Sequence, residues 1–415
     1  MRRALVTPGA APCTLSSFER RLDVDGHIAT GLLGAIRPDI ARLPESGIVE
    51  IVNAGRGKPD LIQLWIGEGD RATPPFVAEA ANRALAEGQT FYTWQRGIPP
   101  LREALAGYVS RLAGVAVPAG RIYVTIGGMQ AIMMTMQALL SPGDEVVMPV
   151  PVWPNIFSAV EIAGGRTVPV PIGVENGRWR LDLDRLFAAC GPKTRALFLN
   201  SPGNPTGWML TAEEQKAILE FCRARGIWIV ADEVYARFVY DRPVAPSFLA
   251  IATPEDRLVV VNTFSKNWAM TGWRIGWIVA SEELGQVFEN LQQFNTSGVP
   301  TFLQYGAVAA IEQGEAFVEN QVEHCRTARD LVIGRLSESS RVRLTRPDGA
   351  FYLFFSVEGE PDSRALALRL LHEANVGLAP GSAFGPGGEG HLRLCFAGSI
   401  ALLETAMERL VPALS

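Results

Sequence analysis

The sequence predicts an α/β protein whose mostly parallel sheet is followed by a smaller α+β region. Short apolar runs alternate with helical patterns through the middle of the chain, which favours a parallel sheet. These runs are continuous in Val, Ile and Leu, as expected for strands that are buried on both faces. The pattern changes after about residue 310. The length of 415 residues is enough for two to three domains.

Six apolar runs in the middle of the chain are predicted to be strands. They are residues 121–126, 144–149, 166–172, 195–200, 227–232 and 257–262. Helical patterns lie between several of them, at 131–140, 157–165 and 211–226. The last pattern begins with Thr211, has two glutamates in its first turn and ends at Gly226, residue types that favour helix ends at those places.

The C-terminal third is predicted to form a smaller α+β domain. A helical pattern covers about 315–337, and strand-like runs at 351–357 and 391–397 enclose a helical pattern at 365–374. The segment before residue 65 is expected to pack with this region. We therefore predict a small domain from residues 36–64 and 311–415, and a large domain from residues 65–310. Residues 1–35 would be an N-terminal extension, with disorder as one option.

Composition argues against several classes of protein. The formal net charge is −5, which disfavours a nucleic-acid partner, and no run of about 18 apolar residues predicts a membrane helix. Five scattered cysteines without a CxxC pair disfavour disulfides and a zinc site, and four dispersed histidines give no metal motif. With no apolar secretory segment at the start, a reducing, cytoplasmic location is expected.

Candidate site residues follow the predicted strands, because active sites of open α/β sheets lie beyond the carboxyl ends of their strands. Gly128 and Met129 follow the first strand and begin a helix, either as an anion site or as an ordinary turn. Asn204 lies in the loop SPGNPTG, which could also be purely structural. Asp232 ends another strand and is followed by Tyr235; this acid could cap a helix or face a cation.

The most informative group follows the run 257–262. Thr263, Ser265, Lys266 and Arg274 place two hydroxyls, an ammonium and a guanidinium within twelve residues, a set that suits a phosphate. The alternative is a solvated edge. A lysine can also form a Schiff base with an aldehyde. Together with an acid for a ring nitrogen, these groups meet the needs of a pyridoxal phosphate enzyme.

Five motifs carry a family resemblance. They are SKNWAMTGWRIGW (265–277), NPTG (204–207), ADEVY (231–235), YTWQRGIPPLREAL (92–105) and PGSAFGPGGEGHLRL (380–394). Over about residues 36–415 the chain resembles the class I/II aminotransferases of the fold-type I pyridoxal phosphate enzymes, in the aspartate-aminotransferase-like branch. The resemblance implies a large three-layer αβα domain, at residues 65–310, that binds pyridoxal 5′-phosphate, plus the smaller α+β domain.

The resemblance also implies roles for individual residues. Lys266 would hold the cofactor covalently and shuttle a proton, and Asp232 would pair with the pyridine nitrogen. Asn204 and Tyr235 would hydrogen-bond the ring oxygen, and Trp153 would stack on the ring. Arg393 would bind the substrate carboxylate, with Gly67, Trp153 and Asn204 nearby. The phosphate would be surrounded by Gly128, Met129, Thr263, Ser265 and Arg274, and by Tyr92 from the other subunit of a homodimer.

The implied activity is an amino-acid aminotransferase that moves an amino group from an L-amino acid to a 2-oxo acid by ping-pong kinetics. A pyridoxal phosphate-dependent lyase, either a C–S β-lyase or an aminocyclopropane-carboxylate-type synthase, would use the same residues and is the alternative. Met129 stands where some acid-specific relatives have a lysine, which weakens the case for a dicarboxylate substrate. Arg96 is either a surface residue or a ligand for such a carboxylate across the dimer.

The segment GPGGEG (385–390) matches the glycine pattern of a dinucleotide-binding turn. It precedes a strand pattern and not a helix, so it does not predict a dinucleotide site.

Overall fold

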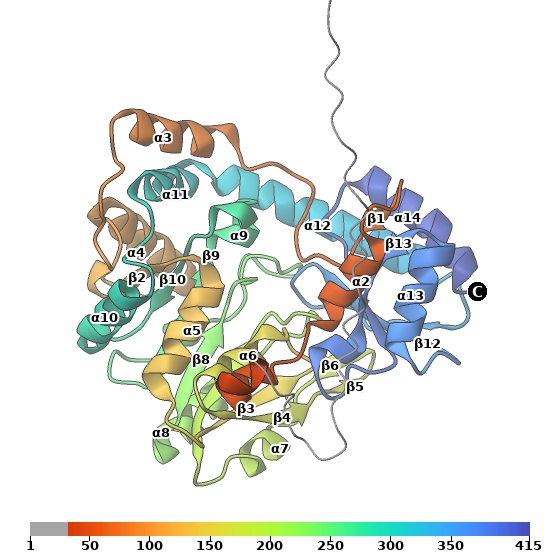
Figure 1. Ribbon diagram of the computed structural model, residues 1–415, viewed down its shortest axis with the longest axis horizontal. Coiled ribbons are helices and arrows are strands. Elements are labelled where there is room, and N and C mark those ends of the chain that lie inside the picture. Colours follow the sequence, from red (N-terminus) through yellow and green to blue (C-terminus); the bar gives the residue numbers. More distant parts are fainter. Residues whose placement is uncertain (1–31) are drawn as a thin grey trace, which may run out of the picture. The chain divides into compact units, whose positions relative to one another are not determined.

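The computed structural model describes residues 32–415, and the chain divides into two units, residues 1–44 and 45–415. The described part of the first unit contains a short 3₁₀ helix, Leu32–Ala35, and α1 (Pro38–Ala41). The expectation for residues 1–31 lies outside the described residues. Figure 1 shows the helices and strands of the second unit.

Helices and strands alternate through most of the second unit. Its helices are α2 (Gly47–Gly55), α3 (Pro75–Ala86), α4 (Pro99–Ala113), α5 (Gly127–Leu139), α6 (Asn155–Ile162), α7 (Leu183–Ala188), α8 (Ala212–Arg225), α9 (Phe264–Asn267), α10 (Gly285–Asn295), α11 (Thr301–Gln313), α12 (Glu315–Leu336), α13 (Ser363–Glu373) and α14 (Ile400–Ala413). Its strands are β1 (Ile62–Gln63), β2 (Ile122–Thr125), β3 (Glu145–Val150), β4 (Arg166–Pro171), β5 (Gly173–Glu175), β6 (Arg178–Arg180), β7 (Thr194–Asn200), β8 (Trp228–Asp232), β9 (Leu258–Thr263), β10 (Gly276–Val279), β11 (Val342–Arg343), β12 (Tyr352–Val357), β13 (Val376–Gly377), β14 (Ala379–Pro380) and β15 (His391–Cys395).

The largest sheet has seven strands in the order β2-β10-β9-β8-β7-β3-β4. The pairs from β9 to β4 are all parallel, whereas β10 is antiparallel to both of its neighbours. The predicted mostly parallel α/β sheet is therefore confirmed. In the register of β7 and β8, Asn200 lies opposite Asp232, so both residues end their strands at the same edge.

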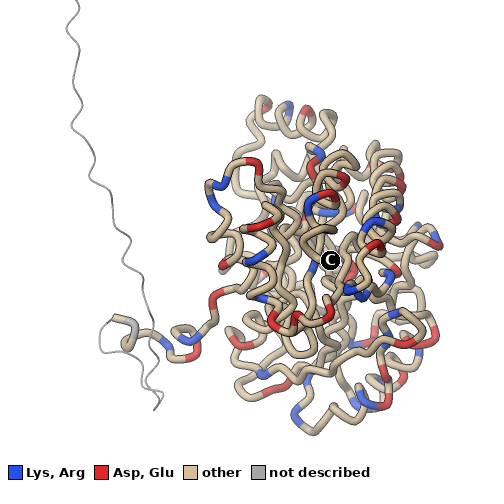
Figure 2. The backbone as a smooth tube through the Cα atoms, turned by 90° about the vertical axis from the view of Figure 1, so that its right-hand side faces the viewer, with Lys and Arg blue, Asp and Glu red and all other residues tan. Residues whose placement is uncertain are grey.

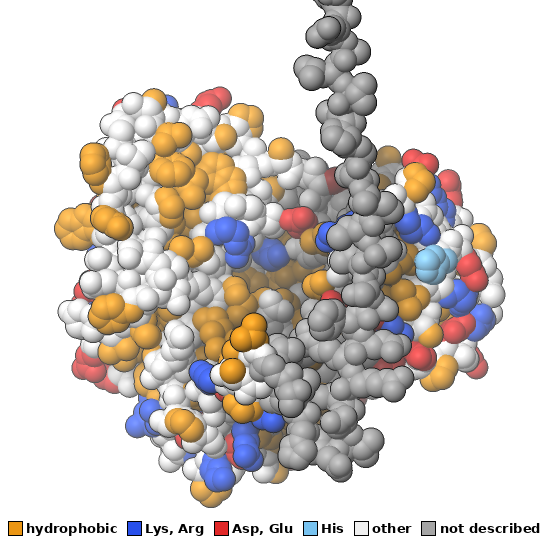
Figure 3. All heavy atoms as spheres, in the orientation of Figure 1, with side chains coloured by type: hydrophobic (Ala, Val, Ile, Leu, Met, Phe, Trp, Pro, Cys, Tyr) orange, Lys and Arg blue, Asp and Glu red, His pale blue; other side chains and the backbone are white. Residues whose placement is uncertain are grey.

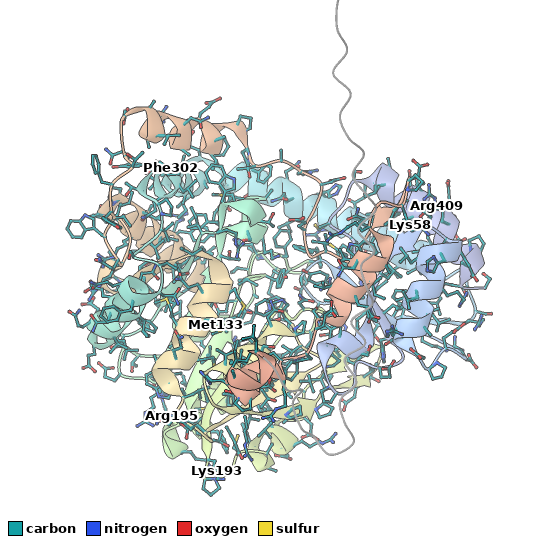
Figure 4. The ribbon with its side chains drawn as sticks, viewed as in Figure 1. Lys58, Met133, Lys193, Arg195, Phe302 and Arg409 are labelled. Atoms are coloured by element: carbon teal, nitrogen blue, oxygen red, sulfur yellow. The ribbon has the colours of Figure 1, made fainter. Side chains whose placement is uncertain are left out.

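Helices cover both faces of this sheet, which gives three layers. In β7, Ala196 and Phe198 point into a core shared with α5, α6 and α10. The intervening Leu197 and Leu199 point into the opposite core, to which α4 and α8 contribute. This alternation follows from the two-residue period of a strand. Arg195, labelled in Figure 4, donates from Nε to the carbonyl of Leu139 at 3.0 Å and joins β7 to the end of α5.

A second, antiparallel sheet of four strands has the order β11-β12-β15-β14. Its interior is shared with α12, α13 and α14. β1 pairs in parallel with β13, with Ile62 opposite Val376. Within the second unit, α2 and β1 thus pack with the C-terminal region, as predicted for this part of the segment before residue 65. The division into domains at residues 64 and 310 stays a prediction.

The individual elements agree closely with the patterns in the sequence. Each of the six predicted strands overlaps a strand of the large sheet. In α8, Thr211 and Glu214 form a reciprocal capping box, and Gly226 ends the helix in the left-handed conformation. Basic and acidic residues are interspersed along the tube in Figure 2. No described helix is long and apolar enough to cross a membrane.

Candidate active site

A cavity of about 440 Å³ lies at the carboxyl edge of the large sheet. Asn200, Asp232 and Thr263, the last residues of β7, β8 and β9, all line it. Ligand sites of open α/β sheets occur at this edge, and their usual volumes, roughly 300–1,000 Å³, include this one. The cavity therefore has the position and size of a small-molecule site.

Asp232 is a buried acid at one side of the cavity. One carboxylate oxygen accepts the N–H of Val234 at 3.4 Å, and the Asp232 carbonyl accepts Asn200 Nδ2 at 3.2 Å. Burial raises the pKa of the Asp232 carboxyl to about 7, although the Val234 N–H and Lys266 act in the opposite direction. A cationic group of a ligand placed against Asp232 would stabilise its charged form.

Lys266 lies in α9, immediately after β9. Its Nζ donates to the carbonyl of Gly67 at 2.7 Å and lies 5.7 Å from the ring centroid of Tyr235. Burial, together with the nearby Arg393 and Arg274, lowers the pKa of Lys266 to about 8. A sizeable fraction of this amine is therefore neutral near physiological pH, the form that attacks a carbonyl or accepts a proton.

A turn suited to an anion joins β2 to α5. Gly127 has a φ of 71°, and a Cβ there would lie 2.5 Å from an Arg274 nitrogen. Gly276 on β10 passes the same turn so closely that a Cβ would lie 2.9 Å from the Gly128 nitrogen. Arg274 thus reaches the N-terminus of a thirteen-residue helix, where N–H groups favour negative charge.

Two hydroxyls join this anion-binding region. Thr263 Oγ1 lies 2.9 Å from Ser265 Oγ and accepts the Ser265 N–H at 3.2 Å. Both residues line the cavity together with Gly128, Met129 and Arg274. A guanidinium, helix N–H groups and hydroxyls in one place are the donors that a phosphate binds.

Arg393 is a buried cation that β15 places at the other side of the cavity. Its guanidinium donates to Asn204 Oδ1 at 3.0 Å and to the carbonyl of Trp65, and it lies 4.6 Å from the Tyr352 ring centroid. Arg393 Nε has no hydrogen-bond partner among the described residues. A buried guanidinium with neutral protein partners and a spare donor is suited to a carboxylate from a ligand.

Tyr352, whose hydroxyl lies 2.7 Å from that of Tyr235, was not among the predicted site residues. A Cβ on Gly67 would overlap the Tyr352 hydroxyl, so the glycine in GEGD makes room for this side chain. Other cavity residues that were missed include Glu68 and three residues of α2, Ile48, Val49 and Val52. The only indication of Tyr352 in the sequence was a tyrosine hydroxyl within the largely apolar strand pattern FYLFFSV (351–357).

All but one of the residues predicted for the site line this cavity. They are Gly67, Gly128, Met129, Trp153, Asn204, Asp232, Tyr235, Thr263, Ser265, Lys266, Arg274 and Arg393. The exception is Tyr92, whose side chain is 95% exposed. Arg96 has a partner within the chain, since its Nε lies 2.6 Å from a Glu289 carboxylate oxygen. No cluster of three or more potential metal ligands occurs in the part of the chain that the structure describes.

Comparison with known proteins places this geometry in a family. The model for aminotransferase class I and II matches residues 59–410. Aromatic-amino-acid aminotransferase 2 of Thermococcus litoralis is 37% identical over 88% of this chain and 94% of its own length. Aspartate aminotransferase of Pyrococcus abyssi is 36% identical with the same coverage. Arginine–pyruvate transaminase of Pseudomonas aeruginosa is 36% identical over 81% of this chain and 85% of its own.

Solved structures give the same result. Aspartate aminotransferase of Thermus thermophilus, solved with maleate, superposes with a TM-score of 0.85 at 36% identity, covering 91% of this chain and 99% of that one. Aromatic aminotransferase of Pyrococcus horikoshii superposes with a TM-score of 0.81 at 36% identity, covering 88% and 98%. These relatives share one fold, but their names state different substrates.

Proposed function

Because the chain belongs to the family of class I and II aminotransferases and is a transaminase, we propose that it uses pyridoxal 5′-phosphate to move an amino group from an L-amino acid to a 2-oxo acid. The single observation that carries this proposal is that Lys266, Asp232, Arg274 and Arg393 line one cavity. The two half-reactions would follow each other at this one site, which is ping-pong kinetics.

The chemistry of the cavity supports this cofactor. The buried Asp232 suits a pyridine nitrogen, because a nearby cation would offset the cost of its buried charge. Arg274, Thr263 and Ser265 suit the phosphate, with Gly128 and Met129 at the N-terminus of α5. Lys266 suits the aldehyde. When bound, the cofactor supplies a carbonyl that takes the amino group and a ring that withdraws electrons.

The side chains around the cavity would orient the substrate and move its proton. Arg393 would hold the α-carboxylate, with its own position fixed by Asn204 and the Trp65 carbonyl. Lys266 Nζ would remove the proton from the substrate Cα and return one to the product, a task that suits an amine with a pKa of about 8. Trp153 would cover one face of the ring. The hydroxyls of Tyr235 and Tyr352 would hold each other in place.

We also propose the domain roles and a homodimer. The cofactor would bind residues 65–310, and residues 36–64 and 311–415 would form the small domain that supplies Arg393. Leu85, Phe91, Tyr92 and Trp94 are exposed, and Figure 3 shows hydrophobic side chains gathered over α3 and α11. Exposed apolar patches favour a protein partner. A second subunit would cover this patch, and Tyr92 would reach the phosphate in that subunit's site.

A cytoplasmic location is part of the same proposal. The described cysteines, Cys190, Cys222, Cys325 and Cys395, are all buried and free. Free thiols are typical of proteins in a reducing compartment.

Transfer of nitrogen itself tests the proposed activity. The protein loaded with pyridoxal phosphate is mixed with a ¹⁵N-labelled L-amino acid and an unlabelled 2-oxo acid, and the products are analysed by mass spectrometry. Appearance of ¹⁵N in the amino acid derived from the 2-oxo acid is expected. Consumption of the donor with label released as ammonia, and none transferred, would contradict transamination and indicate the lyase.

A further inference from the structure

The charged side chains that line the cavity leave no cation for a second substrate carboxylate. They are Glu68, Asp232, Lys266, Arg274 and Arg393. Under the proposed function, each of the three cations already has a ligand: the cofactor aldehyde, the phosphate and the α-carboxylate. Within residues 45–415 no fourth cation lines the cavity. The remaining charged residues of the lining, Glu68 and Asp232, are acids and offer no ion pair to a second carboxylate.

Part of the remaining wall is apolar. The backbone from Trp65 to Gly67 connects the two ends of the substrate region, because the Trp65 carbonyl accepts Arg393 and the Gly67 carbonyl accepts Lys266. Ile66 lies between these two contacts, lines the cavity and is 42% exposed. A substrate held by Arg393 near Lys266 would therefore lie next to an aliphatic side chain.

Helix α2 extends this wall. Ile48 and Val52 are four residues apart and so lie on one face of the helix, and Val49 lies beside them. All three line the cavity, and Val49 is 46% exposed. Ile51 and Gly55 continue the same apolar surface on the side away from Val49: Ile51 is fully buried, and a Cβ on Gly55 would overlap the Trp65 ring. One apolar surface of α2 thus extends from the core, at Ile51 and Gly55, to the cavity, at Ile48, Val49 and Val52.

The protein holds α2 in this place from its C-terminal side. Lys58 Nζ donates to the carbonyl of Leu371 at 2.9 Å, and Arg409 donates to the carbonyl of Asp60 at 2.9 Å. Both basic residues are labelled beside α2 and the C-terminal helices in Figure 4. Glu50 of α2 also pairs with Arg364 of α13. The apolar face is therefore a built part of the site.

We infer that the favoured amino acid has an uncharged apolar side chain, branched aliphatic or aromatic, which packs against Ile48, Val49, Val52 and Ile66. This inference rests on the proposed function and names the substrate class of that site. The family leaves the choice open, since its members are named for aspartate, aromatic amino acids and arginine. Each buried methylene group contributes about fourfold in affinity. A leucine-sized side chain therefore gains at least about tenfold from this wall.

Unreactive carboxylates separate binding from catalysis. Isocaproate and hydrocinnamate are leucine and phenylalanine without the amino group, and succinate is the same analogue of aspartate. Their affinities for the protein loaded with pyridoxal phosphate are measured by titration calorimetry. Isocaproate and hydrocinnamate are expected to bind at least about tenfold more tightly than succinate. Equal affinities, tighter binding of succinate, or no binding of either apolar analogue would overturn the inference.

A matched pair of variants tests the position of the wall. Val49→Arg places a cation on the cavity face of α2 and is expected to shift the preference toward succinate by at least about tenfold. Val174→Arg makes the same change on β5, outside the cavity, where the valine is 50% exposed, similar to Val49 at 46%. Its preference is expected to equal that of the unchanged protein. A Val49→Arg protein with the original preference would show that α2 does not contact the substrate side chain.

The ¹⁵N transfer experiment distinguishes failure of this inference from failure of the proposed function. If nitrogen is transferred from aspartate faster than from leucine or phenylalanine, the protein is an aminotransferase and the inferred substrate class is wrong. If nitrogen is transferred from no amino acid, the proposed function is wrong, whichever carboxylates bind.

Discussion

The two sides of the cavity are built in different ways. On the sheet side, Asp232, Thr263 and Lys266 stand at or just after the ends of adjacent strands, and their positions follow from the parallel β8 and β9. On the other side, Val49 and Ile66 come from near the start of the unit and Arg393 from near its end, more than 300 residues later. The sheet side is polar and holds groups suited to a cofactor, whereas the far side is largely apolar around one arginine.

This difference separates chemistry from substrate choice. The positions of the side chains suited to the reaction are set by the ends of strands, which are rigid and which form ligand sites in other proteins with open α/β sheets. Groups that contact the substrate side chain depend on how distant segments pack on that frame. Changes on the sheet side should therefore abolish the reaction, whereas changes on the far side should alter which molecules bind.

Replacement of Lys266 should have the largest effect. Lys266→Ala removes the proposed proton carrier and the covalent attachment point of the cofactor. Loss of the proton carrier alone should lower kcat by about a hundredfold to ten-thousandfold. Circular dichroism should show an unchanged fold. Lys193→Ala, at an exposed lysine labelled in Figure 4, is the matched control and should retain full activity. Transamination by Lys266→Ala at the normal rate would contradict the mechanism.

Arg393 should control binding on the far side. Arg393→Ala leaves the substrate carboxylate without its buried partner, a loss of about 2–5 kcal/mol that should raise KM for amino acid and 2-oxo acid alike. Arg393→Lys keeps the charge but loses the two-pronged contact, so KM should take an intermediate value. Steady-state kinetics with both substrates measures this. An unchanged KM in Arg393→Ala would remove the residue from the substrate site.

Asp232 and Glu233 are adjacent buried acids, and burial raises the pKa of each carboxyl to about 7. Asp232 faces the cavity, whereas Glu233 accepts hydrogen bonds from Ser247 and the Phe248 N–H. Asp232→Asn should therefore weaken cofactor binding at least about tenfold, since it removes a charged partner of a buried group. Glu233→Gln should leave the cofactor dissociation constant unchanged. Equal effects of the two changes on that constant would contradict the role of Asp232.

The raised pKa of Asp232 also predicts how stability depends on pH. A carboxyl whose pKa is higher in the folded state favours folding most at pH values below about 4, and this stability is lost as the pH rises through about 7. Between pH 5 and pH 8, Asp232→Asn should remove up to about 3 kcal/mol of this dependence from the cofactor-free protein, because one pKa unit corresponds to about 1.4 kcal/mol and about two units lie in this range. Urea unfolding at pH 5 and pH 8 measures it. The same slope in both proteins would show that Asp232 does not titrate as described.

Loss of the Tyr352 hydroxyl should have the smallest effect. Tyr352→Phe removes one partner of the 2.7 Å contact with Tyr235, an interaction of about 1 kcal/mol. We expect a change of roughly fivefold in kcat/KM with an unchanged fold. Tyr240→Phe removes a buried hydroxyl that donates to the Ala350 carbonyl outside the cavity, and it should affect stability but not kcat/KM. A larger kinetic effect in Tyr240→Phe than in Tyr352→Phe would place the sensitive hydroxyl elsewhere.

The same contrast explains how much could be predicted from sequence. Strands that are buried on both faces are visible as apolar runs, so residues that follow them could be placed at one edge of the sheet. Capping residues identified both ends of α8 in the same local way. β10 was not predicted, because its short run follows the tryptophan-rich motif and its antiparallel position depends on pairing with β2 and β9.

The missed residues of the far side depend on long-range register. Tyr352 comes close to Arg393 because β12 and β15 are paired, with Phe354 opposite Arg393 and Tyr352 two residues before Phe354. The cavity face of α2 likewise depends on its packing against Trp65, whose ring would overlap a Cβ at Gly55. No local pattern specifies such a register. The sequence therefore predicted the residues suited to the reaction more completely than the residues that form the substrate pocket.

The half-reaction with an amino donor alone is the decisive experiment for transamination by this protein. The protein loaded with pyridoxal phosphate is mixed with leucine, phenylalanine or aspartate without a 2-oxo acid, and both the cofactor absorption and the released 2-oxo acid are measured. Our account predicts one equivalent of 2-oxo acid per site, loss of the aldehyde-form absorption, and its return when a 2-oxo acid is added. Continuous product formation without any acceptor, or no change with any donor, would contradict it.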